Sequence, residues 1–408
     1  MNMELCETAK GIGGKVVDHH ELDGWGGTQQ VVSTASGFFR VEQIDSRWWF
    51  IDPDGHAFFS LGINHVEEAD LKYPDNVDVW ESKYGSSRER WMKAVPNDLR
   101  RLGFNTLGWT QQWVAGDYAR DVWNEPVDLL HSSGWTPYEL RSAGMPYVQV
   151  LPFARFEGWN AHPVYPDVFS REFADYCDFV ARALCMPARE DPNLIGYFFQ
   201  DVPCWARHRK SATFFAGVDD TSYRQVFDVA AKYYEVATAA IRRVDPNHLI
   251  FGDRFNGNLG IEPAALAAAA NVVDALAVQW FPSISDGAAE AMCEALAEIH
   301  ASTGKPILNP DAGNNTATPT HPARPDALAD QAARGAHYAT MLNAIAAQPW
   351  CIGWHWCGYI DNPVRGAGIK SPNDEDYGDL TRQMHAANSE IYATALLGAA
   401  RYTSTEQQ

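Results

Sequence analysis

Short apolar runs recur along the chain, and each of them ends in polar or aromatic residues. Eight such runs are AFFSLGINHV from Ala57, FNTLGWT from Phe104, VQVLPFAR from Val148, IGYFFQD from Ile195, HLIFGDRF from His248, ALAVQWFP from Ala275, PILNPDAG from Pro306 and CIGWHWCGYID from Cys351. Amphipathic stretches of helical period lie between them, among them SREFADYCDFVARAL, YRQVFDVAAKYYEVATAAIRRV and DQAARGAHYATMLNAIAA. The first of these opens at Ser170, a helix-capping residue type, with Glu172 close behind. Strands that alternate with helices predict parallel pairing, and eight repeats predict an α/β fold closed into a (β/α)8 TIM barrel over residues 57–408.

A different pattern precedes the first of these runs. The segment GFFRVEQIDSRWWFIDPDGH, residues 37–56, alternates with a period of two, and turn-forming residues stand at Asp45-Ser46 and at Pro53-Asp54-Gly55. This predicts a β-hairpin, which we expect to close the floor of the barrel. Residues 1–36 form an N-terminal extension in this interpretation. No linker rich in Pro, Gly or Ser divides the chain, so a single domain is expected overall.

Charge and cysteine content narrow the function. The formal net charge is -20 and the pI is about 5.0, which oppose binding to nucleic acid or to an anionic membrane surface and favour a neutral or cationic small molecule. The seven cysteines are odd in number and lack tight spacing, so no disulfide framework is expected. Neither a signal-peptide run nor a membrane-spanning run is present, which predicts a cytoplasmic protein. The oligomeric state is left open.

Polar and aromatic side chains stand where the predicted strands end. In a barrel of this kind the carboxyl ends of the strands converge on one face, which carries the active site. The residues that arrive there are Asn64, His65, Trp109, Arg155, Gln200, Asp201, Asp253, Gln279, Trp280, Asp311, His355, Trp356 and Asp361. Indole rings stack on the C–H faces of sugars, and glycoside hydrolysis requires two carboxyl groups that flank one bond. Long loops after several of the strands indicate a deep pocket and cleavage from a chain end.

Several of these segments resemble the agarase-like members of the large (β/α)8 clan of retaining glycosidases. The resemblance is carried by the run from Gly37 to Val66 and by FNTLGW, YPDVFSREF, DPNLIGYFFQDVP and GWHWCGYID. In that clan an Asn-Glu pair ends strand four and supplies the acid/base, and a Glu on strand seven is the nucleophile. Here Gln200-Asp201 and Asp311 stand at these positions.

The resemblance therefore implies Asp201 as the general acid/base and Asp311 as the nucleophile. It also implies that Gln200 holds a sugar hydroxyl and that Trp205 walls the pocket. The implied substrate is a short neutral oligosaccharide, galactose-containing or of agar type, and no cofactor or metal is expected. As a general acid, Asp201 has to carry a proton at neutral pH.

Aspartate is one methylene shorter than glutamate, which bears on the stereochemistry. Retaining glycosidases keep their two carboxyl groups about 5–5.5 Å apart, whereas inverting ones keep them about 6.5–9.5 Å apart to admit a water. Two aspartates on an unchanged backbone move toward the second range. Inversion is therefore a hypothesis beside the retention that the family implies.

Other interpretations of the same residues stay open. Asp201 and Asp361 could cap the segments that follow them, Asp311 could belong to a turn, and Asp253 could form a structural ion pair with its neighbour Arg254. His65 and His355 could be core-rim histidines. At the level of the whole protein, the alternatives are a catalytically inactive barrel that binds sugar, and a metal-dependent barrel hydrolase in which His65, His355, Asp253 and Asp311 approach one another.

Overall fold

A closed barrel of parallel strands forms the centre of the molecule. The structure is a computed structural model that describes residues 22–72, 74–110, 134–154, 166–203, 205, 223–322, 324, 326–361 and 366–405. The barrel strands are β5 (Ser60–Ile63), β6 (Thr106–Leu107), β7 (Tyr147–Val150), β8 (Leu194–Asp201), β9 (Leu249–Asn256), β10 (Leu276–Gln279), β11 (Ile307–Ala312) and β12 (Cys351–Trp356). They pair in chain order, and β12 pairs with β5 to close the ring. Each strand overlaps one of the eight predicted runs, so the predicted (β/α)8 barrel is confirmed.

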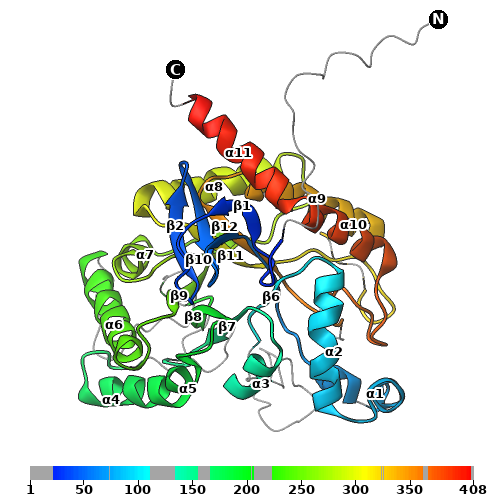
Figure 1. The fold of residues 1–408 in the computed structure, drawn as a ribbon, viewed down its shortest axis with the longest axis horizontal. Coiled ribbons are helices and arrows are strands. Elements are labelled where there is room, and N and C mark those ends of the chain that lie inside the picture. Colours follow the sequence, from blue (N-terminus) through cyan, green and yellow to red (C-terminus); the bar gives the residue numbers. More distant parts are fainter. Residues whose placement is uncertain are drawn as a thin grey trace, which may run out of the picture.

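Helices surround the strands, as Figure 1 shows. They are α1 (Val77–Tyr84), α2 (Arg88–Arg101), α3 (Pro137–Ser142), α4 (Arg171–Val180), α5 (Met186–Ala188), α6 (Tyr223–Val244), α7 (Pro263–Ala270), α8 (Ala288–Thr303), α9 (Gln331–Ala346), α10 (Gly378–Ser389) and α11 (Ile391–Thr405). The Ser170 hydroxyl accepts the Phe173 N–H and so caps α4 as the sequence predicts. Among the described residues, no helix is long and apolar enough to cross a membrane.

A small antiparallel sheet lies against the amino-terminal end of the barrel. Its strands are β1 (Thr28–Val32), β4 (His56–Phe58), β3 (Arg47–Ile51) and β2 (Arg40–Ile44), hydrogen-bonded in that order. The predicted hairpin is β2–β3, and its turn residues Asp45 and Ser46 both have positive φ, 48° and 64°. The sheet is therefore larger than the predicted hairpin, because β1, which precedes the hairpin in the sequence, also pairs in it.

Aromatic side chains of this sheet fill the barrel floor. Phe50 and Phe58 are fully buried in one cluster with apolar residues from the starts of the barrel strands, such as Phe251. The rings of Phe50 and Phe251 meet edge to face with 6.0 Å between their centres. In Figure 1 the blue strands of the sheet lie across the centre of the helical ring. Closure of the floor leaves the carboxyl ends of the strands as the face on which a site can form.

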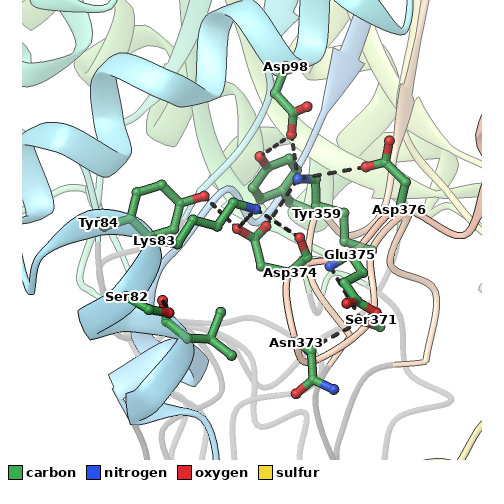
Figure 2. A network of polar contacts seen from close by, with 12 residues as sticks. Ser82, Lys83, Tyr84, Asp98, Tyr359, Ser371, Asn373, Asp374, Glu375 and Asp376 are labelled. Carbon is green, nitrogen blue, oxygen red and sulfur yellow. Dashed lines mark hydrogen bonds and ion pairs between the residues drawn. The ribbon is translucent and has the colours of Figure 1, made fainter.

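A buried lysine holds the long loop between β12 and α10. Lys370 Nζ lies 2.5 Å from Asp98 and 3.1 Å from Asp374, with its side chain 4% exposed. Figure 2 shows Asp98, Tyr359, Asp374 and Asp376 pointing toward one common centre. Burial alone would raise the pKa of Asp98, but the Lys370 charge and its hydrogen bonds prevail and lower that pKa to about 2. The network joins this loop to α2 and so ties the last barrel unit to the first.

Candidate active site

Arg254 stands at the centre of the polar side chains at the mouth of the barrel. Its Nη1 lies 2.9 Å from Asp201 Oδ1, and its Nη2 lies 3.1 Å from Asp311 Oδ2. The guanidinium is fully buried, and its carbon lies 4.3 Å from the centre of the Trp109 ring. The sequence-based interpretation treats Arg254 only as a partner for Asp253, so this central residue was missed as part of the site.

The shared guanidinium brings the two predicted catalytic carboxylates together. Asp201 ends β8 and Asp311 lies on β11, the fourth and seventh barrel strands. Because a guanidinium is a compact planar fork, the oxygens that it holds lie less than ~9 Å apart. Both side chains are largely buried, with Asp201 9% and Asp311 5% exposed. This limit lies within the separation of up to about 9.5 Å that glycosidases allow between their two carboxyl groups.

Two amide side chains orient these carboxylates. Asn64, directly after β5, donates from Nδ2 to Asp311 Oδ1 over 2.8 Å, while its own Oδ1 accepts the Trp109 N–H over 2.8 Å. Gln279, at the end of β10, donates from Nε2 to Asp201 Oδ1 over 2.5 Å. Asn64, Trp109 and Gln279 are thus predicted site residues that the structure brings to the carboxylates. The hydrogen bonds from Asn64 and Gln279 fix the orientation of the two carboxylates.

His65, Trp280 and Cys357 lie around Asp311. His65 has a left-handed backbone, φ 51°, and its ring meets the Trp109 ring edge-on at 4.8 Å. One ligand-type atom from each of His65, Asp311 and Cys357 lies within 4.8 Å of the others. Both Asp311 oxygens already accept hydrogen bonds or an ion pair, and the Arg254 charge opposes a cation there. Cys357 was not among the predicted site residues.

The predicted tryptophan rings differ in how far they are exposed to a ligand. Trp109 is 2% exposed and carries Arg254 on its face. Trp280, whose backbone N–H donates to the backbone carbonyl of Asp311 over 3.3 Å, has an only partly buried side chain. A Cβ at Gly257 would come within 2.5 Å of the Trp280 ring, so glycine is needed to seat it. Of the predicted indoles, Trp280 is the one that keeps part of its surface exposed, while Trp109, Trp205 and Trp356 are buried.

Gln200 faces away from its neighbour Asp201. Its amide nitrogen donates to the Ala154 carbonyl, and its Oε1 is buried without a hydrogen-bond partner among the described residues. The side chain lines a cavity of about 510 Å³ between β6–β8 and the helices, together with Gln149, Trp135 and Tyr176. The predicted role of Gln200, holding a sugar hydroxyl beside the scissile bond, stays a prediction.

The structure does not bring Asp253 or Trp205 to the carboxylate pair. Asp253 is fully buried and accepts hydrogen bonds from the Gln200 N–H, the Trp205 indole and the hydroxyls of Tyr233 and Tyr234 on α6. Burial raises its pKa to about 6, although these donors counteract it. Asp253 anchors β9 to α6, so it neither faces the mouth nor pairs with Arg254. Trp205 packs against the same tyrosines rather than beside Asp201.

Three predicted residues on and after β12 also lie away from the pair. His355 is fully buried inside the barrel, where its Nε2 lies 2.8 Å from the Ser60 hydroxyl. Trp356 points outward and packs against Tyr338 of α9, with 5.2 Å between ring centres. Asp361 accepts the Gly368 N–H and the Tyr377 hydroxyl, so it holds its own loop as a capping residue does.

Two further sequence-based predictions concern Arg155 and a metal cluster. Arg155 lies outside the described residues. His355 and Asp253 point to the barrel interior and to α6 respectively, so they do not join His65 and Asp311 in the metal cluster that the sequence left open.

Comparisons with known proteins agree with this architecture. No family model matches the chain. The chain is 21% identical to Beta-agarase B and 22% identical to Beta-agarase A, both from Vibrio sp. (strain JT0107), over 90% of its length. It spans about half the length of these relatives, 49% and 47%. The resemblance to agarases indicated by the sequence motifs is thereby confirmed.

Solved structures give the same result for the fold. An agarase crystal structure matches with a TM-score of 0.71 at 17% identity, over 92% of this chain and 66% of that one. An exo-beta-agarase matches with a TM-score of 0.71 at 17% identity, over 94% and 69%. A Bacteroides uniformis beta-glucuronidase matches more weakly, with a TM-score of 0.56 at 12% identity over 86% and 37%.

Proposed function

We propose that this chain is a glycoside hydrolase that cleaves short neutral oligosaccharides of agar type from a chain end. The observation that carries the proposal is the pairing of Asp201 and Asp311, from barrel strands four and seven, around one buried guanidinium. The similarity to β-agarases over 90% of the chain supports the substrate class, and the likeness to an exo-beta-agarase structure supports cleavage from a chain end. The net charge of -20 favours a neutral sugar over an acidic one.

Asp311 is the residue suited to act on the anomeric carbon. Asn64 and Arg254 each hold one of its oxygens, which fixes its orientation. An ionised, oriented carboxylate can attack the anomeric carbon, or activate a water that does so, and it stabilises the positive charge that develops there. The hypothesis of inversion remains open, and proton NMR of the first-formed anomer tests it. A product that keeps the configuration of the substrate excludes inversion.

Asp201 takes the role of general acid/base in this proposal. Arg254 and Gln279 both donate to its Oδ1, whereas protonation of the leaving oxygen requires a proton on this carboxyl group. Aryl glycosides whose leaving group needs no proton should then be cleaved faster than oligosaccharides of the same sugar.

The proposal is tested by incubating the protein with agar-derived oligosaccharides of defined length and with a panel of aryl glycosides. Chain-end cleavage releases one product size from substrates of every length, and internal cleavage releases a mixture. Asp201→Asn should slow hydrolysis of the oligosaccharides more than hydrolysis of activated aryl glycosides. Equal slowing of both classes would contradict the acid/base role.

A second candidate is a barrel that binds the same sugars without cleaving them. The observation that favours it is the double hydrogen bonding of Asp201 Oδ1, which engages one oxygen of the predicted acid within the protein. Binding without turnover on every compound, unaffected by Asp201→Ala, would support this candidate.

A further inference from the structure

A second group of charged side chains lies at the opposite end of the barrel from the carboxylate pair. Asp23 belongs to the turn before β1, Asp52 follows β3, and His56 begins β4. One ligand-type atom of each residue lies within 4.8 Å of the others, and His56 Nδ1 is 2.7 Å from Asp23 Oδ2. Asp52 and His56 are 4 residues apart in the sequence, whereas Asp23 lies 33 residues before His56.

The backbone fixes one oxygen of each aspartate and so aims the other. Asp23 Oδ1 accepts the N–H groups of Trp25, Gly26 and Gly27 over 2.9, 2.9 and 2.8 Å. Asp52 Oδ1 accepts the N–H groups of Asp54 and His56 over 2.9 and 3.0 Å. Hydrogen bonds of this kind orient carboxylates that ligate metals. The two remaining oxygens are thereby directed toward the same space.

That space contains a buried acceptor without a donor. Asp52 is fully buried, and its Oδ2 has no hydrogen-bond partner among the described residues. A Cβ at position 27 would stand 2.3 Å from Asp52 Oδ2 and 3.3 Å from Asp23 Oδ2, so Gly27 keeps the space clear. Asp23 Oδ2 has His56 Nδ1 as its neighbour, whereas the buried Asp52 Oδ2 beside it needs either a cation or a proton shared with Asp23, because an uncompensated buried charge is costly.

We propose that Asp23 Oδ2, Asp52 Oδ2 and His56 Nδ1 bind a divalent first-row transition metal ion, for which Zn²⁺ is the probe. Two carboxylates balance its charge, and the imidazole favours zinc or a neighbouring metal over Ca²⁺ and Mg²⁺. Ligands at about 2.0–2.2 Å from zinc require the His56 and Asp23 atoms to separate by roughly half an ångström. The His56 side chain is 23% exposed, which provides a path for the ion.

The position of this site indicates a structural role. The ion would join the turn before β1 to the turn between β3 and β4, and so hold together the sheet that closes the barrel floor. Tyr392 of α11 donates to the Gly26 carbonyl over 2.5 Å and accepts the Phe59 N–H over 3.2 Å. The same turn is therefore linked to the last helix and to the first barrel strand. The ion would raise stability and take no part in the chemistry at the mouth.

The test starts from the full chain, stripped with a chelator and dialysed. Calorimetric titration with Zn²⁺ should show one ion bound per chain, and saturating Zn²⁺ should raise the melting temperature by roughly 5 °C. Asp52→Asn and His56→Gln should each abolish this increase. Asp45→Asn is the matched control, since Asp45 is an exposed turn residue of the same sheet, and it should keep the full increase.

Three results would overturn the proposal. One is the absence of zinc binding by the wild-type chain, as expected if the two carboxyl groups share a proton instead. Another is an equal increase in melting temperature in wild type, Asp52→Asn and His56→Gln, which would place the ion elsewhere. A third is loss of the initial hydrolysis rate at 25 °C on chelation with no change in melting temperature, which would indicate a catalytic metal rather than a structural one.

Discussion

Arg254 donates to Asp201 over 2.9 Å, and the same guanidinium reaches Asp311 from its other nitrogen. Two carboxylates brought this close repel each other, and in many enzymes one of them stays protonated as a result. The cation between them offsets this repulsion. The electrostatics of the candidate active site therefore depend on a residue from a third strand, β9.

Replacement of Arg254 by methionine should destabilise the fold. The change leaves two largely buried carboxylates without their counter-charge, and breaking a buried pair in this way costs about 3–5 kcal/mol. Chemical denaturation at pH 7 measures the loss. Arg243→Met, which breaks an exposed pair with Asp178, is the control and should cost less than about 1 kcal/mol. Equal stability of the two variants would contradict the bridging role.

Asp201 and Asp253 should respond differently to the same substitution. Asp201→Asn should lower kcat on oligosaccharides by roughly 10²–10⁴-fold because it removes the proton donor. Asp253→Asn weakens the contacts with Trp205, Tyr233 and Tyr234, so it should lower the free energy of unfolding by about 1–3 kcal/mol. Unfolding curves and kinetics on both variants provide the comparison. A larger kinetic effect from Asp253→Asn would reverse the assignment.

His355 should make stability depend on pH in the weakly acidic range. Burial first, and then the Arg254 charge, lower its pKa from 6.5 to about 3. The unfolded chain binds the proton at a higher pH than the folded chain does, so stability should fall as the pH drops from 6.5 toward 3. Denaturation curves at pH 7, 6, 5 and 4 measure how the free energy of unfolding changes with pH. In His355→Gln the slope should be smaller, and an unchanged slope would mean that another group titrates.

The ion pair between Lys370 and Asp98 should make stability depend on pH in a more acidic range. The pKa of Asp98 is lowered from 3.8 to about 2, so the stabilisation of its ionised form is present above pH 3.8 and is lost as the pH falls through 2. Lys370→Met should destabilise the chain by about 3–5 kcal/mol at neutral pH, and by less near the acid end of this window. Lys93→Met, which breaks an exposed pair with Glu89, should show neither effect. A Lys370→Met deficit that is independent of pH would contradict the role of its charge.

The positions of the strands and helices could be predicted from the sequence because each element has its own hydrophobic pattern. Strand β8 is an unbroken apolar run that ends at a polar pair, and α6 spans Tyr223–Val244, the segment that the helical period marks. Helix α4 ends at Val180, earlier than predicted, and a wider π-helical turn over Ala181–Cys185 follows it. These signals are local, so no knowledge of the barrel is needed to find them.

The direction of the side chains at the mouth could not be predicted in the same way. Along a barrel strand, successive side chains point alternately inward and outward. A bulge or register shift changes this alternation, and the sequence does not mark where it occurs. Gly252 has φ +69° and the β8–β9 register shifts nearby, and here Arg254 faces the mouth while Asp253 faces α6. The register between β11 and β12 shifts at the start of β12 and again between Trp354 and Trp356, where His355 faces inward and Trp356 outward. The metal-type cluster was missed for a related reason, since its residues meet only once the sheet has formed.

The central claim is that Asp311, held by Asn64 and Arg254, acts on the anomeric carbon of an agar-type sugar. The most direct test is the initial rate at which reducing ends appear from an agar-derived oligosaccharide, measured for wild type and for Asp311→Asn at equal concentrations of folded protein. The wild type should release product from the chain end, and Asp311→Asn should be slower by roughly 10³-fold or more. A variant that retains the wild-type rate, or a wild type that cleaves none of these oligosaccharides, would contradict the claim.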